Sequence, residues 1–330
     1  MGSNIRTALV TIAIGDHHQR EFETYALPSL RAYAQKHDYE LIAITEPFAP
    51  IDPNSSKTIH WHKILLGQVP AIKAFDRVIW IDTDIVINSR LAPDITEDVP
   101  VEKIGIVELS DNPQIEAATE TLNTLYNIVL REHFGDVHEF VKPDVKIKDQ
   151  YKRADLTPTP DKFCNTGVFV FSPKHHNEFF AQTFLKYDKN FDDFENTPLS
   201  FEIFSNNLNH GIDPRFNTLW SDELSLKYPF LARRDILEDF YYRVKNNKSI
   251  NEGLYAQWYT WCTNASFQSA YFLHFSGGRN NPLTKVPMRY VKTDAENVFG
   301  ATFPEYYSDI LNAKPTQYGS PFSHRKIDDE

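Results

Sequence analysis

The sequence predicts an α/β fold built on a mixed, mainly parallel sheet that is flanked by helices. Residues 7–14 and 39–45 are rich in β-branched residues, and residues 19–37 between them carry apolar residues at helical spacing. A strand, a helix and a strand with short connections form a βαβ unit, which places both strands parallel in one sheet. Because ligands bind beyond the carboxyl ends of such strands, the residues that follow each strand are the first candidates for a site.

The same patterns predict further elements along the chain. We expect strands at residues 77–82, 103–108, 163–171 and 269–275. We expect helices at residues 61–75 (with a break at Pro70), 113–133, 173–190 and 199–209. Residues 134–160 hold many charges and three prolines and predict a long surface loop, and residues 313–330 predict a loose tail.

Composition excludes some classes of partner. The 330 residues carry a net charge of −11, whereas nucleic acids and anionic membranes require a basic surface. An acidic protein still binds an anionic cofactor where a metal supplies positive charge. Aromatic residues make up 14% of the chain, which indicates an aromatic core or, for some rings, a carbohydrate site.

The cysteines and the hydropathy pattern predict a cytoplasmic protein. Cys164 and Cys262 are the two cysteines, too few for a disulfide framework and not spaced as metal ligands. We find no signal peptide, and no apolar run reaches the roughly 18 residues that span a bilayer. We therefore expect reduced thiols and no transmembrane segment.

Asp82 and Asp84 are paired carboxylates inside an apolar run. Residues 78–81 and 85–87 on either side of them are apolar. Residues two apart in extended backbone point to the same side, so both carboxylates would face one ligand. Such a pair suits a divalent cation that keeps positions open for phosphate oxygens. The alternative is chance, since average composition gives about one Asp-x-Asp in a chain of this length.

His274 is the candidate third ligand. It ends a predicted strand and is followed by Gly277, Gly278 and Arg279, which allow a backbone to approach phosphate closely. Arg279 or Lys285 would add a cation for a diphosphate. Taken alone, a histidine before such a turn is more often structural.

Together these segments resemble the GT-A fold sugar transferases, in particular the retaining group that includes glycogenin and the bacterial lipopolysaccharide galactosyltransferases. The shared segments, in the family's order, are residues 10–14, 82–84, 165–171, 213–217 and 274–277. They cover roughly residues 5–285. Residues 61–63, Trp-His-Lys, are also similar to related fungal and plant galactosyl- and xylosyltransferases.

The resemblance implies a single GT-A domain over residues 5–290, with a nucleotide-binding half at about 5–110 and an acceptor half at about 111–290. Residues 291–330 would be a C-terminal extension. The implied reaction moves a hexose or pentose from a nucleoside diphosphate sugar, expected to be a UDP-sugar, with retention and with Mn²⁺ or Mg²⁺. The implied partners are the sugar nucleotide and a carbohydrate, glycolipid or protein acceptor, and the resemblance allows a homo-oligomer.

The resemblance also assigns roles to residues. The implied metal ligands are Asp82, Asp84 and His274. The residues implied to contact the donor are Ile14, Gly15, Asp16, Lys63, Thr83, Gly277 and Arg279. Asn165 is expected near the transferred sugar, and Glu202 beside the anomeric carbon as stabiliser or nucleophile. An ordinary helix residue is the alternative for Glu202.

Two departures from the family leave other functions open. A Lys-Pro-Trp that usually follows the histidine motif is replaced by residues 280–282, Asn-Asn-Pro, and an Asp-Gln pair by Phe201 and Glu202. A sugar nucleotidyltransferase is one alternative, although residues 15–18 offer one glycine and no lysine. A non-catalytic carbohydrate-binding protein on a transferase scaffold is the other. Glu108 is a further candidate for the border of the site. Asp222 and Glu223 are candidates for an acceptor contact, although capping a helix is the commoner role of such residues.

Overall fold

The structure is a computed structural model that describes residues 5–49, 55–134, 146–277, 283 and 285–293, with side chains in the helix at 113–134 described in part. The chain separates into two units, Met1–Val291 and Lys292–Glu330, and the first is described below. The extension expected at residues 291–330, the tail expected at 313–330 and Arg279 lie wholly or almost wholly outside the described residues.

The larger sheet of the described residues confirms the predicted fold class. Its six strands run in the order β2 (Glu40–Ile44), β1 (Thr7–Ile12), β3 (Arg77–Ile81), β6 (Val168–Phe171), β5 (Ile104–Ile106) and β7 (Asn209–Gly211). The pairs β1–β2, β1–β3 and β5–β7 are parallel, whereas β6 is antiparallel to both β3 and β5. The sheet is therefore mixed and mainly parallel.

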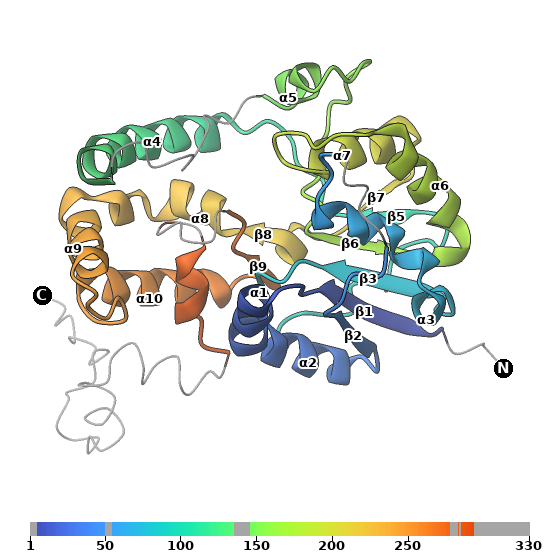
Figure 1. Cartoon of the computed structure of the whole chain (residues 1–330), viewed down its shortest axis with the longest axis horizontal. Coiled ribbons are helices and arrows are strands. Elements are labelled where there is room, and N and C mark those ends of the chain that lie inside the picture. The colour runs from blue at the N-terminus through green and yellow to red at the C-terminus, as the bar shows by residue number, and fades with distance from the viewer. Residues whose placement is uncertain (1–4, 50–54, 135–145, 278–282, 284, 294–330) are drawn as a thin grey trace, which may run out of the picture. The chain divides into compact units, whose positions relative to one another are not determined.

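Helices cover both faces of this sheet (Figure 1). Alternate strand residues face opposite ways. Val78 and Phe169 therefore lie in one core, and Ile79 and Val170 lie in another core on the opposite face. The helices on the side of Ile79 and Val170 are α1 (Asp16–Glu21), the π-helix η1 (Phe22–Ala26) and α2 (Leu27–Lys36). The helices on the side of Val78 and Phe169 are the 3₁₀-helix η2 (Ile59–Gln68), α3 (Pro70–Lys73), α6 (Pro173–Lys186) and α7 (Asn196–Ser205).

A second, three-stranded sheet follows the paired aspartates. Its order is β4 (Ile85–Ile87), β9 (Phe272–His274) and β8 (Thr218–Leu219). A third apolar core lies beside it and is built largely from helices. The elements around it are η3 (Pro214–Asn217), α4 (Pro113–Phe134), α8 (Trp220–Lys227), η4 (Pro229–Ala232), α9 (Arg234–Lys245), α10 (Leu254–Phe267) and η5 (Val286–Tyr290).

Three expectations about local structure were wrong. The predicted loop at 134–160 contains helix α5 (Ile147–Arg153), because Ile147 and Tyr151 lie four residues apart and are both buried. The strand expected at 163–171 is confined to β6, and Phe163 forms an isolated bridge with Leu109. The helix expected at 61–75 is mostly 3₁₀.

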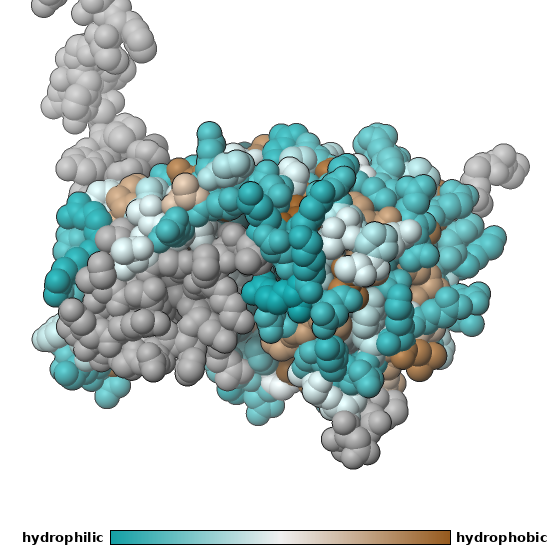
Figure 2. Space-filling model, turned by 90° about the horizontal axis from the view of Figure 1, so that it is seen from above, coloured by the Kyte–Doolittle hydropathy of each residue, from teal (hydrophilic) through white to brown (hydrophobic). Residues whose placement is uncertain are grey.

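Three further observations concern the cysteines, the helices and the surface. Cys164 and Cys262 are free and buried. None of the helices in the described part of the chain is long and apolar enough to cross a membrane. The face shown in Figure 2 is mainly hydrophilic outside the grey atoms, and its hydrophobic residues appear in small separate areas.

Replacement of Leu199 by alanine tests the core between α7 and the sheet. Leu199 is fully buried, so Leu199→Ala should lower the free energy of unfolding by about 2–5 kcal/mol. Leu185→Ala is the matched control, because Leu185 is a helical leucine with 79% of its surface exposed. Chemical denaturation measures both, and equal losses would contradict the packing described here.

Candidate metal and nucleotide site

The paired aspartates lie where the chain passes from one sheet to the other. Strand β3 ends at Ile81 and β4 begins at Ile85, so Asp82, Thr83 and Asp84 form the connection. The Asp82 amide donates to the carbonyl of Gly167 over 2.8 Å, and the Asp84 carbonyl accepts from the amide of Phe275 over 2.9 Å. The backbone is thereby fixed on both sides of the triplet.

Strand pairing brings His274 to the aspartates. Strand β4 is antiparallel to β9, and this register sets Ile85 opposite His274. The Nε2 atom of His274 lies 3.3 Å from Asp84 Oδ1 and 4.0 Å from Asp82 Oδ2. One ligand atom from each of the three residues lies within 4.8 Å of the others. The structure therefore brings the three predicted metal ligands together.

The tautomer of His274 suits a metal ligand. The imidazole is buried, and its Nδ1 lies 2.8 Å from the side-chain oxygen of Asn217. An amide oxygen only accepts, so Nδ1 carries a proton and donates to Asn217, and Nε2 is the ring atom that faces the carboxylates. Histidine ligands in proteins are commonly oriented in this way. Two carboxylates and one imidazole suit Mn²⁺, and the carboxylates also suit Mg²⁺.

Lys285 supplies positive charge on the other side of Asp84. Its Nζ lies 2.8 Å from Asp84 Oδ2. Burial acts to raise the pKa of Asp84, but Lys285 and His274 outweigh it and hold the pKa well below its usual range. Asp84 is therefore ionised at any ordinary pH.

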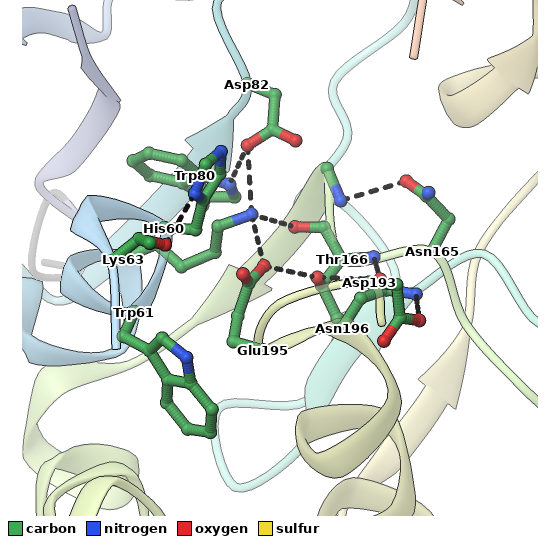
Figure 3. Close-up of polar contacts among 12 residues, drawn as sticks. His60, Trp61, Lys63, Trp80, Asp82, Asn165, Thr166, Asp193, Glu195 and Asn196 are labelled. Carbon is green, nitrogen blue, oxygen red and sulfur yellow. Dashed lines mark hydrogen bonds and ion pairs between the residues drawn. The ribbon is translucent and has the colours of Figure 1, made fainter. Parts of the chain in front are cut away.

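Lys63 joins the triplet to a carboxylate that the sequence analysis did not identify (Figure 3). The Lys63 ammonium is buried and lies 3.0 Å from Asp82 Oδ1 and 2.7 Å from Glu195 Oε1. It also donates to the carbonyl of Thr166 over 3.3 Å. Burial acts to lower the pKa of Lys63, and the two carboxylates overcome it and raise the pKa above its usual value.

Glu195 lies just before helix α7 and is almost fully buried. Burial raises its pKa, against the opposing effect of Lys63. Its Oε1 also accepts a hydrogen bond of 3.1 Å from the Thr166 hydroxyl. In the sequence, a run of acidic residues ahead of Pro198 indicates the start of a helix and could have drawn attention to Glu195. Nothing in the sequence shows that Glu195 meets Lys63.

Hydrogen bonds through the side chain of Asn217 connect Asn165 to His274. The Asn165 side-chain oxygen accepts from the Gly167 amide over 3.0 Å and from Asn217 Nδ2 over 3.1 Å. Asn217 in turn holds the His274 imidazole. A Cβ at Gly167 would lie 2.4 Å from His274 Cε1, so the ring position depends on glycine there.

A cavity of about 230 Å³ opens beside the triplet. Seven residues predicted to bind the metal or the donor line it, namely Ile14, Lys63, Asp82, Thr83, Asp84, Gly277 and Lys285, together with others that include Ile12, His60 and Trp80. Trp80 Nε1 donates to Asp82 Oδ1 over 3.0 Å.

Gly15 has a φ of 93°, which favours glycine, and turns the chain from β1 into α1 at Asp16. The roles of Ile14, Gly15, Asp16, Lys63, Thr83 and Gly277 toward a donor remain predictions, as does that of Arg279 outside the described residues.

The catalytic role expected of Glu202 stays a prediction, and the structure shows which groups its carboxylate contacts. Its carboxylate accepts hydrogen bonds from the ammonium of Lys186 and the hydroxyl of Tyr187. Glu202 follows Glu195 by seven residues, which is roughly 10 Å along a helix. Of the two glutamates, Glu195 is the one joined to Lys63 and Asp82.

Comparison with known proteins finds similar structures, whereas the two comparisons of the sequence find no match. No protein-family model matches the chain. No curated protein matches it either.

The structure of the bifunctional glycosyltransferase WbbM is similar with a TM-score of 0.50 and 13% identity, over 94% of this chain and 52% of WbbM. The chain therefore spans about half the length of that protein.

Two other glycosyltransferases are similar at lower scores. A glycosyltransferase involved in glycosylation of the major capsid of PBCV-1 matches with a TM-score of 0.45 and 12% identity, over 86% of this chain and all of that one. The galactosyltransferase LgtC, solved with donor and acceptor sugar analogues, matches with a TM-score of 0.40 and 14% identity, over 92% and 99%. At these identities the likeness shows the fold alone. The predicted resemblance to GT-A fold glycosyltransferases is confirmed at that level.

Gly167→Ala should weaken binding of Mn²⁺ at least tenfold, because the added methyl group displaces the imidazole of His274. Titration of the protein with Mn²⁺, followed by electron paramagnetic resonance, measures the affinity. Gly211→Ala is the control, since its Cβ would meet Glu108 at 3.2 Å instead of His274. Unchanged affinity in Gly167→Ala would show that His274 is not a ligand.

Lys63→Met should destabilise the protein by about 3–5 kcal/mol, because the buried Glu195 and the partly buried Asp82 then lose their shared cation. Adding Glu195→Gln to this variant should restore part of the loss, since one of those charges is gone. Urea denaturation of the two single variants and the double variant gives the coupling energy. Lys148→Met, which breaks an exposed pair with Asp161, should change little, and strictly additive losses would contradict the buried pair.

Proposed function

We propose that this chain is a metal-dependent glycosyltransferase that moves a hexose or pentose from a nucleoside diphosphate sugar to an acceptor. The observation that carries the proposal is the convergence of Asp82, Asp84 and His274, with both aspartates in the lining of a cavity that Lys63 and Lys285 also line. The shared fold with WbbM, a glycosyltransferase by its description, supports the same class of reaction.

Asp82, Asp84 and His274 would hold the metal, as their donor set fits Mn²⁺. When bound, such a cation neutralises the negative charge that develops on the leaving diphosphate. Asp84 would offer an ionised oxygen, and His274 would offer Nε2 while its Nδ1–H donates to Asn217. Lys285 and Lys63 add positive charge on either side of the pair.

The donor would lie with its nucleoside toward Ile14 and its diphosphate toward Asp84. The apolar side chains of Ile12 and Ile14 line one part of the cavity and the charged groups line another, which matches the two ends of a sugar nucleotide. We propose a UDP-sugar as the donor and retention of anomeric configuration, on the resemblance stated from the sequence. We propose Asn165 and Glu195 as polar groups beside the transferred sugar, because Asn165 precedes Thr166 and Glu195 accepts from it, and Thr166 contacts Lys63.

A screen of nucleotide sugars by thermal shift, with and without Mn²⁺, identifies the donor. A ligand at 100 times its dissociation constant adds about 2.7 kcal/mol of stability. Release of the free sugar or its transfer then establishes that the protein is an enzyme, as opposed to a carbohydrate-binding protein. Release of pyrophosphate from a nucleoside triphosphate would instead indicate a sugar nucleotidyltransferase.

Asp84→Asn should abolish the Mn²⁺-dependent stabilisation by the donor and lower turnover by roughly 10²–10³-fold, because the amide is a poor ligand for the cation that neutralises the leaving group. Sugar release and the shift in melting temperature measure the two effects. Asp98→Asn, at an exposed aspartate outside the cavity, is the matched control. Full activity of Asp84→Asn would refute the proposal.

A further inference from the structure

A second cavity, of about 500 Å³, lies next to the candidate donor site. Its walls come from the segment after β5, the start of α4, helix α5, the residues before β6 and the junction of β8 with α8. This volume lies within the range of small-molecule sites in proteins. The two cavities share no lining residue, but Asn165, which lines the second cavity, is linked to His274 through Asn217.

Asn165 places the second cavity beside the group that would hold the metal. Its side chain lines the cavity, and its Oδ1 is held by Asn217, which also holds His274. The next residue, Thr166, contacts Lys63 and Glu195. A molecule in the second cavity would therefore meet a sugar nucleotide across the segment from Asn165 to Gly167.

Hydrogen bonds fix the walls of the cavity. Asp111 Oδ1 accepts from the amide of Ile147 over 2.9 Å and so holds the first turn of α5. Gln150 on α5 donates to Asp193 and Thr197 over 3.2 and 3.0 Å, which ties α5 to the start of α7 near Glu195. The cavity is thus bounded by connected elements and its shape is built into the fold.

The charged side chains in the described lining of this cavity are all negative. Four carboxylates line the cavity, namely Glu108, Asp111, Glu116 and Asp222, and among the described lining residues there is no lysine, arginine or histidine. Lys162, the cation bound to Glu108, is about half exposed. Burial acts to raise the pKa of Glu108, but hydrogen bonds from Lys162 and Asn209 outweigh it and lower the pKa, so this carboxylate is ionised.

Apolar side chains complete the lining. Leu109, Ile147, Phe163 and Leu219 add hydrocarbon surface between the carboxylates. Carboxylates accept strong hydrogen bonds from hydroxyl and ammonium groups, whereas they repel other anions. A lining of this kind suits a molecule that carries many hydroxyl groups and an apolar face.

We propose that this cavity binds the acceptor and selects a neutral or amine-bearing sugar against an anionic one. The inference rests on the proposed function and specifies its acceptor class. Uronic acids, sialylated sugars and phosphorylated sugars would be poor acceptors because each would bring negative charge among four carboxylates.

Matched sets of methyl glycosides test the proposal in the full-length protein with Mn²⁺ and the donor that the screen identifies. Each set holds a hexoside, the corresponding amino sugar and the corresponding uronoside, in several ring configurations. We expect transfer to the hexoside or the amino sugar in at least one set, with kcat/KM for its uronoside at least about tenfold lower.

Glu116→Gln separates the charge of the cavity from its shape. The change removes one negative charge from the lining with little change in volume, so the penalty against the uronoside should fall about threefold or more. Glu120→Gln is the matched control, because Glu120 is an exposed residue of the same helix outside the lining, and the penalty should stay as in the unaltered protein.

The outcomes separate this inference from the proposed function. If the unaltered protein neither binds nor hydrolyses any sugar nucleotide, the proposed function and the inference fail together. If it hydrolyses a donor and prefers a uronoside, or transfers to no member of any set, the inference alone fails. An equal fall in the penalty for Glu116→Gln and Glu120→Gln would also overturn it.

Discussion

The arrangement of the site depends on one buried ammonium group, that of Lys63. Glu195 is a buried carboxylate, Asp82 and Asp84 are partly buried ones, and buried charges of one sign are unstable without a counter-charge. Lys63 comes from η2 and meets Asp82 at the end of β3 and Glu195 before α7. Three segments far apart in the sequence are held together at this point, and Lys285 plays a comparable part for Asp84.

The segment from Asn165 to Gly167 makes the two cavities neighbours. Gly167 lies against the His274 ring, Thr166 bonds to Glu195, and Asn165 lines the second cavity. The same short run of backbone also pairs with Asp82. A donor on one side and an acceptor on the other would therefore be positioned by a single rigid element, which is what a transfer between two bound molecules requires.

Much of this site could be predicted from the sequence, and the reasons are local. Asp82 and Asp84 were recognisable because charges are rare inside an apolar strand, and His274 because it ends a strand before a glycine-rich turn. Glu195 could not be found, since its meaning comes from a contact with Lys63, 132 residues earlier. The resemblance led to Glu202 instead, and only the packing around helix α7 decides that Glu195 is the glutamate that meets Lys63.

The sequence by itself determined the α/β class, the strand ends that carry polar groups and the three metal-ligand candidates, because periodicity and residue type are properties of short segments. Tertiary structure alone decided that β4 leaves the larger sheet to pair with β9, which sets His274 against Asp84. It alone decided that α5 and the start of α4 enclose a second, acidic cavity. Both depend on contacts between distant residues, and no local pattern encodes which distant surfaces meet.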